Sequence, residues 1–568
     1  MSALNVFNFL SSRDTTDPLQ NPRTAAAWLH ELPALDVMER QQQVMRAFET
    51  MRHNRKPVDL ARANAVVFLD AALGADRRQL IKQYVENVET APSTTNRLWQ
   101  ALQELTQAFV FGYKAALEQA IAQSATAKWK AVVPMLFARL IHYHGTDSKL
   151  RVFRFERWIP AKWKELHELY ARAVELGVDR APTALGSSAA NVTQWTVEQE
   201  YINVLLMHQL NTGNLTPAEL DWGSAQLRAW TRRLTLDASS RSPDGFVVDI
   251  AGKAGLVRRG GGEPRGTARY LDTTPLAAQL DRAIVAIRRA GDLDTSAQAS
   301  MNRQRISILE RIRPSVAPSL LSDMRRDPRV PVQVSAQVRV GLGRICRDIV
   351  QQGPAPAPQQ SDTEHIEVFA VNDGSQPRRR AVDDTGDSMM ASLGGFSEAT
   401  WKVKDRSVAG LRIAASGGIG KSLALGALVA VQQADLSEWV LGVVRRLNRL
   451  SNDDSEAGLS IIAERIVPVT LNVRRDDDGA LAMDVNGLDV STMGARFDGL
   501  YLPPPSRPDK PLSVKSLIIP TSEYVDGRSI LLTTGRSIYT VALRHMVEQR
   551  ADWTWCAIQI VEKKPRAY

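Results

Sequence analysis

Apolar residues recur at three- and four-residue steps along much of the first half of the chain, from about Asp36 to Arg313. In one stretch the apolar positions are Leu98, Leu102, Leu105, Phe109, Tyr113 and Leu117. Polar side chains fill the positions between them, and this spacing predicts a long helix with one buried stripe. Similar spacing predicts helices at residues 37–51, 60–73, 163–174, 201–210 and 276–287. Because no fixed repeat period relates these segments, we expect a helical bundle or irregular helical array over residues 36–315, preceded by an N-terminal extension at residues 1–35.

A short segment inside the helical region has a different pattern. Phe246, Val247 and Val248 form an apolar run that precedes three consecutive glycines at residues 260–262. A run of β-forming residues followed by a glycine-rich turn favours a β-hairpin. We therefore expect a hairpin near residues 245–272, embedded among the helices.

The hydrophobic period changes to two residues after Asp323. Valine or alanine occupies every second position from Val330 to Val340, which is the pattern of a strand with one buried face. Between residues 351 and 397, Pro, Gln, Asp, Ser and Gly replace most large apolar residues, so we expect a disordered or weakly ordered insertion. Strand patterns resume at Trp401 and reach Ile461, and they predict an antiparallel β-barrel at residues 320–465.

Strand patterns continue beyond Ile466 and end in a run that contains Trp553 and Trp555. Many short strands separated by turn residues predict a second small β-barrel or sheet at residues 466–568. A chain of 568 residues is long enough for two or three domains. The expected fold class is therefore multidomain α+β, with an N-terminal all-α bundle or array followed by an antiparallel β-barrel and a second small β module.

Composition narrows the class of protein further. The net charge is +9, but acidic residues are interspersed with the basic ones along the chain, which favours a solvated surface over a nucleic-acid-binding one. The two cysteines, Cys346 and Cys556, are far apart and lack Cys or His neighbours, so we expect reduced, packed thiols in a cytosolic protein. The sequence has neither a basic leader with an apolar run nor twenty successive apolar residues. We therefore expect a cytoplasmic protein without an export signal or a membrane span.

Two polar motifs lie on either side of the predicted insertion. Their residues are Arg325, Arg326 and Arg329 before the first strand, and Asp405, Ser407 and Gly410 after the insertion. The first motif reads Arg-x-x-x-Arg and the second reads Asp-x-Ser-x-x-Gly. With the strand pair that follows, at residues 439–459, they resemble the two signature motifs of the PilZ family. This resemblance covers residues 323–464, about a quarter of the chain.

The resemblance implies a receptor for the bacterial second messenger cyclic di-GMP, a dianion that carries two guanines. A guanidinium can fork onto a phosphate or onto a guanine edge, and the resemblance gives this role to Arg325 and Arg329, with Arg326 as a further candidate. It also implies that Asp405 accepts hydrogen bonds from guanine, that Ser407 contacts phosphate or base, and that Gly410 turns the backbone with a positive φ.

At the level of the whole protein, the resemblance implies a second-messenger effector and not an enzyme. Cyclic di-GMP is then its ligand, and no metal or other cofactor is expected. The helical region would contact an as yet unidentified protein partner.

Other interpretations follow from the same residues. The β domain could be a ligand-free structural scaffold, or the basic surface could bind nucleic acid. The segment from Gly417 to Ser422 resembles the end of a phosphate-binding P-loop, but Ala415 replaces its first glycine and no helical pattern follows. His142 and His144 lack an accompanying ligand cluster, which favours ordinary helix-end histidines over a metal site. The arginines at residues 378–380 are either a solvated run or an electrostatic arm for an acidic partner.

Overall fold

The computed structural model describes most of the chain. The described residues are 17–32, 36–53, 57–88, 91–123, 126–184, 194–210, 213–240, 244–259, 266–290, 296–319, 328–351, 401–434, 436, 438–451, 453–474, 493–504, 515–533 and 537–565. Internal contacts divide the chain into two compact units, Met1–Met324 and Arg325–Tyr568. Each unit is described by itself below.

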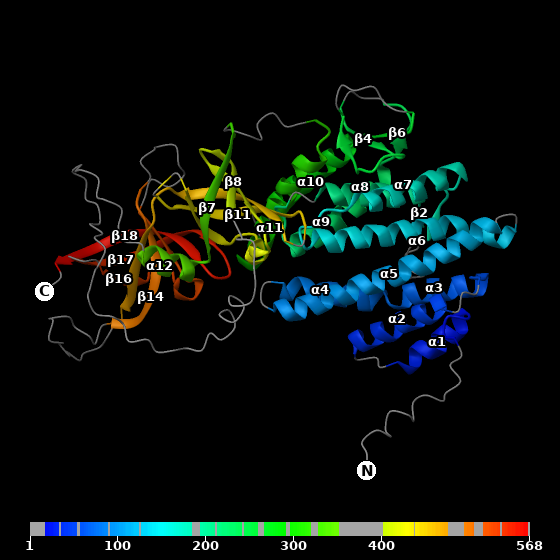
Figure 1. Cartoon of the computed structure of the whole chain (residues 1–568), viewed down its shortest axis with the longest axis horizontal. Helices are drawn as coiled ribbons and strands as arrows, with labels where there is room; N and C mark the ends of the chain where they lie inside the picture. The colour runs from blue at the N-terminus through cyan, green and yellow to red at the C-terminus, as the bar shows by residue number, and fades with distance from the viewer. Residues whose placement is uncertain are drawn as a thin grey trace, which may run out of the picture. The chain divides into compact units, whose positions relative to one another are not determined.

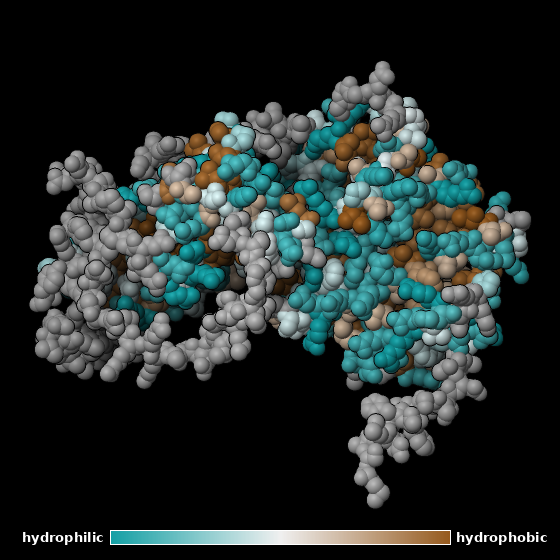
Figure 2. Space-filling model, in the orientation of Figure 1, coloured by the Kyte–Doolittle hydropathy of each residue, from teal (hydrophilic) through white to brown (hydrophobic). Residues whose placement is uncertain are grey.

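The first unit is an array of helices (Figure 1). Its helices are α1 (Pro22–Glu31), α2 (Val37–His53), α3 (Leu60–Ala72), α4 (Gly74–Asn87), α5 (Pro92–Ala122), α6 (Ala127–Val152), α7 (Pro160–Glu175), α8 (Val197–Gln209), α9 (Pro217–Trp230), α10 (Thr274–Ala290) and α11 (Ser296–Val316). Each segment predicted to be helical from its apolar spacing falls on one of these helices. Helix α6 packs on both α5 and α8, and on the face shown in Figure 2 hydrophilic residues cover much of the array.

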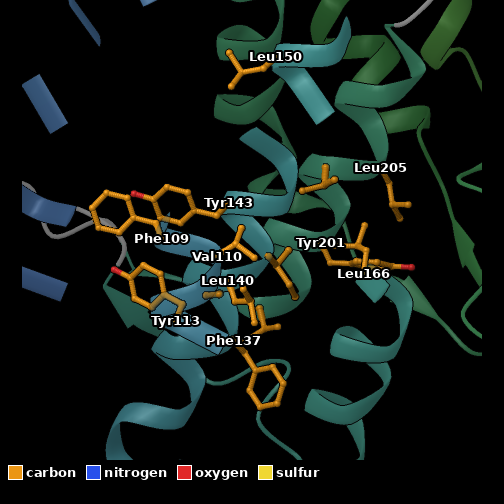
Figure 3. Close-up of a cluster of buried hydrophobic side chains, with 14 of the residues drawn as sticks. Phe109, Val110, Tyr113, Phe137, Leu140, Tyr143, Leu150, Leu166, Tyr201 and Leu205 are labelled. Atoms are coloured by element: carbon orange, nitrogen blue, oxygen red, sulfur yellow. The ribbon is translucent and has the colours of Figure 1, made fainter. Parts of the chain in front are cut away.

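The core of this unit is centred on α5 and α6. Phe109 and Tyr113 from α5 meet Tyr143 from α6, and the three rings stack with centroid distances of 4.9 Å for Phe109–Tyr143 and 5.7 Å for Tyr113–Tyr143 (Figure 3). All three side chains are almost completely buried. Leu166 from α7 and Tyr201 from α8 extend the same cluster. The apolar stripe predicted on the α5 helix is therefore the contact surface of the array.

A buried carboxylate ties four helices of the array, α3 to α6, together. Asp70, on α3, accepts hydrogen bonds from the hydroxyls of Tyr113 and Tyr143, each at 2.6 Å. It also forms ion pairs with Arg139 at 2.5 Å and with Arg77 at 2.6 Å. Burial by itself would raise the pKa of Asp70, but Arg77 and Arg139, helped by the two hydroxyls, hold this pKa at about 2. The carboxylate is therefore ionised and compensated inside the unit.

The hairpin predicted in the helical region belongs to a small four-stranded sheet of order β3-β6-β4-β5. Its strands are β3 (Leu236–Asp237), β4 (Phe246–Asp249), β5 (Val257–Arg258) and β6 (Ala268–Leu271), and β4 pairs antiparallel with both β5 and β6. A second, two-stranded sheet joins β1 (Thr183–Ala184) to β2 (Gln194–Trp195). The glycines at residues 260–262 lie outside the described residues.

The second unit contains two closed antiparallel barrels, which confirms the predicted fold class. The first barrel has the order β10-β11-β12-β9-β8-β7 and the second β13-β14-β15-β18-β17-β16. Their strands are β7 (Val330–Val340), β8 (Trp401–Ser407), β9 (Gly410–Ala415), β10 (Leu428–Gln433), β11 (Val440–Arg449), β12 (Ser455–Ala463), β13 (Val467–Arg474), β14 (Met493–Leu502), β15 (Ser516–Ile519), β16 (Ser529–Thr533), β17 (Ser537–Gln549) and β18 (Thr554–Pro565).

Helix α12 (Leu342–Gln351), which we did not predict, follows β7 directly and packs against both barrels. Leu342, Ile345 and Cys346 join a buried cluster whose other members lie on strands of the two barrels or directly before them. The Cys346 thiol donates to the carbonyl of Gly499 at 3.6 Å. Both cysteines are buried and free, as expected from the sequence. Most of the insertion predicted between β7 and β8 lies outside the described residues.

Polar contacts also join the barrels. A bulge in β11 occurs at Arg445, and the Arg445 guanidinium donates two hydrogen bonds of 2.6 Å to the carboxylate of Glu548 on β17. Arg550 pairs with the same carboxylate at 2.7 Å. The Trp553 indole donates to the carbonyl of Gly426 at 3.1 Å. Because a bulge re-aims a side chain, the irregularity in β11 places a cation of the first barrel on an anion of the second.

Candidate functional site

The two predicted motifs meet at one end of the closed first barrel, beside the turn that joins β8 to β9. We call this end of the two strands the β8–β9 edge. In the pairing of β7 with β8, Pro331 lies opposite Asp405 and Val330 lies opposite Arg406. Arg329 immediately precedes β7, and its Nη1 atom lies 2.5 Å from Oδ1 of Asp405, although the two residues are 76 positions apart in sequence. The chain therefore returns to the same sheet edge after the segment between β7 and β8.

A second arginine contacts the other oxygen of the same carboxylate. Arg412, on β9, is the direct cross-strand partner of Asp405, and its Nε lies 3.4 Å from Asp405 Oδ2. Directly opposed residues in an antiparallel pair project from the same face. The Asp405 side chain is 15% exposed, whereas those of Arg329 and Arg412 are 40% and 45% exposed. The carboxylate is thus enclosed between two guanidinium groups that solvent can reach.

The network extends one strand further. Nη2 of Arg412 lies 3.9 Å from Oε1 of Glu456 on β12, whose side chain is 20% exposed. Arg329, Asp405, Arg412 and Glu456 therefore alternate in sign from the residue before β7 across β8, β9 and β12. This arrangement holds the arginines in place without ligand, and it leaves guanidinium faces on the surface that can receive an anion.

Ser407 and Gly410 lie at the turn that joins β8 to β9. The two residues pair across the turn, and the Ser407 hydroxyl donates to the carbonyl of Gly410 at 3.4 Å. The φ angle of Gly410 is not positive, so the expected left-handed turn is wrong. A Cβ atom at this position would lie 2.7 Å from the carbonyl oxygen of Leu459 on β12. Glycine is therefore required here by the close approach of a neighbouring strand, and not by the turn.

The structure places four of the six predicted site residues, Arg329, Asp405, Ser407 and Gly410, around the β8–β9 edge. Arg325 and Arg326 lie outside the described residues, and their roles stay a prediction. Arg412 and Glu456 were not predicted. The alternation of exposed Arg412 with buried Leu411 and Ile413 is the sequence signal that could have placed Arg412 on the outer face beside Asp405.

The segment that resembles a P-loop does not have the structure of one. Gly417 and Gly418 have φ angles of 72° and 79°, and a 3-10 turn at Ile419–Ser422 leads on toward strand β10. A P-loop needs a helix whose first amides face the phosphates. A Cβ atom on Gly420 would lie 2.8 Å from Cβ of Ser455, so this glycine serves packing against β12.

The two histidines of α6 lie near carboxylates of the helical array. Both lie inside α6 (Ala127–Val152), which corrects the expectation that they lie at a helix end. Nδ1 of His142 lies 2.9 Å from Oε1 of Glu200, and the buried His144 ring lies 3.9 Å from Glu165. In the described part of the chain, no group of three or more His, Cys, Asp or Glu residues could hold a metal ion. The arginines at residues 378–380 lie outside that part.

Comparison with known proteins concerns the helical unit. No described helix is both long and apolar enough to cross a membrane. No curated protein matches the chain. Residues 23–242, which run from α1 into the segment after β3, match a family described as "Cyclic-di-GMP receptor FimW, N-terminal domain". The helical unit is therefore similar, over most of its length, to the N-terminal domain of a cyclic di-GMP receptor.

Proposed function

We propose that this chain is a cyclic di-GMP effector and that the β8–β9 edge of the first barrel forms part of its ligand site. Two independent features support the proposal. The helical unit matches the N-terminal domain of a cyclic di-GMP receptor, and the Arg-x-x-x-Arg and Asp-x-Ser-x-x-Gly motifs resemble those of the PilZ family. The observation that carries the proposal is the contact between Arg329 and Asp405, because it brings both motifs to one place.

The chemistry of the edge suits the ligand. Each phosphodiester of cyclic di-GMP carries one negative charge, which a guanidinium matches with two parallel hydrogen bonds. The guanine base presents an N–H and an amino group side by side, and a carboxylate can accept from both. In this proposal Arg329 contacts the phosphate or the base, together with Arg325 and Arg326. Asp405 accepts from guanine, and Ser407 and Gly410 line the turn beside them.

The ion pair between Arg329 and Asp405 does not prevent binding. Both side chains have access to solvent, and pairs of this kind contribute about 1 kcal/mol or less to stability. A hydrogen bond to a charged group contributes about 1.5 to 3 kcal/mol. Two new contacts, one to phosphate and one to guanine, therefore outweigh the contact that is lost. The ion pair keeps the site assembled until the ligand replaces it.

The output of binding is a change in the helical unit or its neighbours. Cyclic di-GMP can shift an equilibrium between arrangements only as far as its affinity for them differs. We propose that the ligand contacts the arginine segment before β7 and thereby alters the surface that the helical unit offers to a protein partner. The protein acts by binding, in the cytoplasm of a bacterium, and not by catalysis.

The test uses calorimetric titration of the full chain with cyclic di-GMP. Arg329→Ala is expected to weaken binding by about tenfold or more, since about 1.4 kcal/mol corresponds to one decade. A charge-swapped variant with Arg329→Asp and Asp405→Arg keeps an ion pair at the same place but reverses its polarity toward the ligand. Because the new cation at position 405 faces Arg412, the unfolding midpoint of this variant is measured beside its affinity, and the folded variant should bind poorly.

A matched control is Arg496→Ala, which removes an exposed cation from β14 in the second barrel. It should leave the affinity unchanged. Wild-type affinity in the charge-swapped variant would contradict the proposed site. If the wild-type chain binds no cyclic di-GMP, the scaffold interpretation applies, whereas DNA binding with steep salt dependence and no base preference would indicate the nucleic-acid interpretation.

A further inference from the structure

The Asp405 carboxylate has a second cation that ligand binding does not need to displace. Arg329, which precedes β7, lies at Oδ1, and Arg412, on β9, lies at Oδ2; β7 and β9 are the two neighbours of β8 in the barrel. In the proposed function, on which this inference rests, Arg329 turns to the ligand and releases Oδ1. A carboxylate without a second partner would then be free to rotate about its terminal torsion, which is soft. The ion pair with Arg412 restrains this rotation.

Arg412 is itself held by its strand and by its neighbours. It lies on β9, opposite Asp405 on β8 and opposite Gly458 on β12. Glu456, two residues before Gly458, contacts its guanidinium at 3.9 Å. Because Gly458 has no side chain, nothing from that position stands between Arg412 and the outer face of β12. The guanidinium is therefore fixed between two carboxylates across three adjacent strands.

We infer that Arg412 is a positioning residue that orients Asp405 toward the Watson–Crick edge of guanine and so determines base selectivity. Its Nε lies 3.4 Å from Oδ2, an ion-pair distance that leaves a second acceptor direction of this oxygen open. Oδ1 and the second lone pair of Oδ2 then face the base together. This arrangement fits the paired N1–H and 2-amino donors of guanine, and it does not fit the acceptor N1 of adenine.

The selectivity of binding separates positioning from simple charge. Cyclic di-GMP and its hypoxanthine analogue, cyclic di-IMP, carry the same phosphates, but the analogue lacks the 2-amino group. If Arg412 only adds positive charge, it should raise the affinity for both dinucleotides by the same factor. If Arg412 orients Asp405, it should raise the affinity for cyclic di-GMP more than that for cyclic di-IMP, because only guanine uses both oxygens of the carboxylate.

The experiment is calorimetric titration of both dinucleotides into the full chain carrying Arg412→Ala, Arg412→Lys or the control Arg496→Ala. Arg412→Ala should lower the ratio of the affinities for cyclic di-GMP and cyclic di-IMP by about tenfold. This change corresponds to about 1.4 kcal/mol, the loss expected when Asp405 no longer accepts from both guanine donors. Arg412→Lys should recover part of this preference, since an ammonium can still contact Oδ2. The control should keep the wild-type preference.

The outcomes also separate this inference from the proposed function. If Arg412→Ala weakens both dinucleotides by the same factor, or leaves both affinities unchanged, the positioning role is wrong although the ligand site stands. If Arg329→Ala binds cyclic di-GMP like the wild type, the ligand site itself is wrong. Unfolding midpoints of the variants should match that of the wild type, because Arg412 is half exposed and its ion pairs contribute little to stability.

Discussion

Replacing the buried carboxylate of the helical unit tests how the array is held together. Asp70→Asn keeps the shape of the side chain and removes its charge, so Arg139 and Arg77 lose their buried counter-ion while Tyr113 and Tyr143 donate to a weaker acceptor. Breaking a buried ion pair by removing one partner typically costs about 3 to 5 kcal/mol. The lowered pKa of Asp70, about 2 against 3.8, accounts for about 2 kcal/mol of that loss.

The expected loss is a large part of the stability of a typical domain, which is about 5 to 15 kcal/mol. Urea unfolding followed by far-UV circular dichroism measures it, because most helices of the described chain belong to the first unit. Hydrogen exchange at α3, α5 and α6 should report the change locally. Asp281→Asn, which breaks an exposed pair with Arg313, is the control and should cost less than about 1 kcal/mol. Equal losses in the two variants would refute the reasoning.

Two further predictions concern the join between the barrels and the response to acid. Glu548→Gln removes the anion that Arg445 and Arg550 share. In calorimetry we expect the two barrels of the wild-type chain to unfold in one thermal transition and those of the variant in a broader or split one; the same transition in both chains would show that the pair does not couple the barrels. Burial lowers the pKa values of His144 and His208 from 6.5 to about 4, so the unfolded chain binds more protons between these values. Stability of the helical unit should therefore be fully present above pH 6.5 and fall as the pH drops toward 4, and a flat urea midpoint over this range would contradict the assignment.

The sequence was sufficient to predict the helices and strands whose apolar residues recur at a regular spacing within one segment. Alternation at Val330–Val340 predicted β7, and the apolar steps from Leu98 to Leu117 predicted α5, because each pattern has the period of its element. The stripe on α5 is buried, whereas on β7 only Val338 is buried and Val330 is exposed. Helix α12 was not predicted because it is only ten residues long. A single glycine separates it from the preceding strand, and a proline-rich segment follows it. Its apolar residues nevertheless recur at helical steps, at Leu342, Ile345 and Ile349.

The site was predictable only in part. The motif residues could be named from the chain, but their meeting depends on the pairing of β7 with β8, which no local pattern specifies. Arg412 becomes a neighbour of Asp405 only through strand register. The requirement for glycine at position 410 also depends on a residue distant in sequence, since the carbonyl that excludes a side chain belongs to Leu459 on another strand. Register and close approach arise from tertiary packing, and a single sequence carries them weakly.

The position of β7 in the first barrel has a consequence for the order of assembly. Strands β8 and β9 are joined by a two-residue turn and can form a hairpin early, whereas β7 pairs only with β8 and β10, both distant in sequence. Closing such long loops costs chain entropy before any contact compensates it, so β7 should dock late. A nascent or partly unfolded chain would then carry the aspartate half of the motif without its arginine half. In the proposed function, the ligand site would therefore be complete only after the final closure of the barrel.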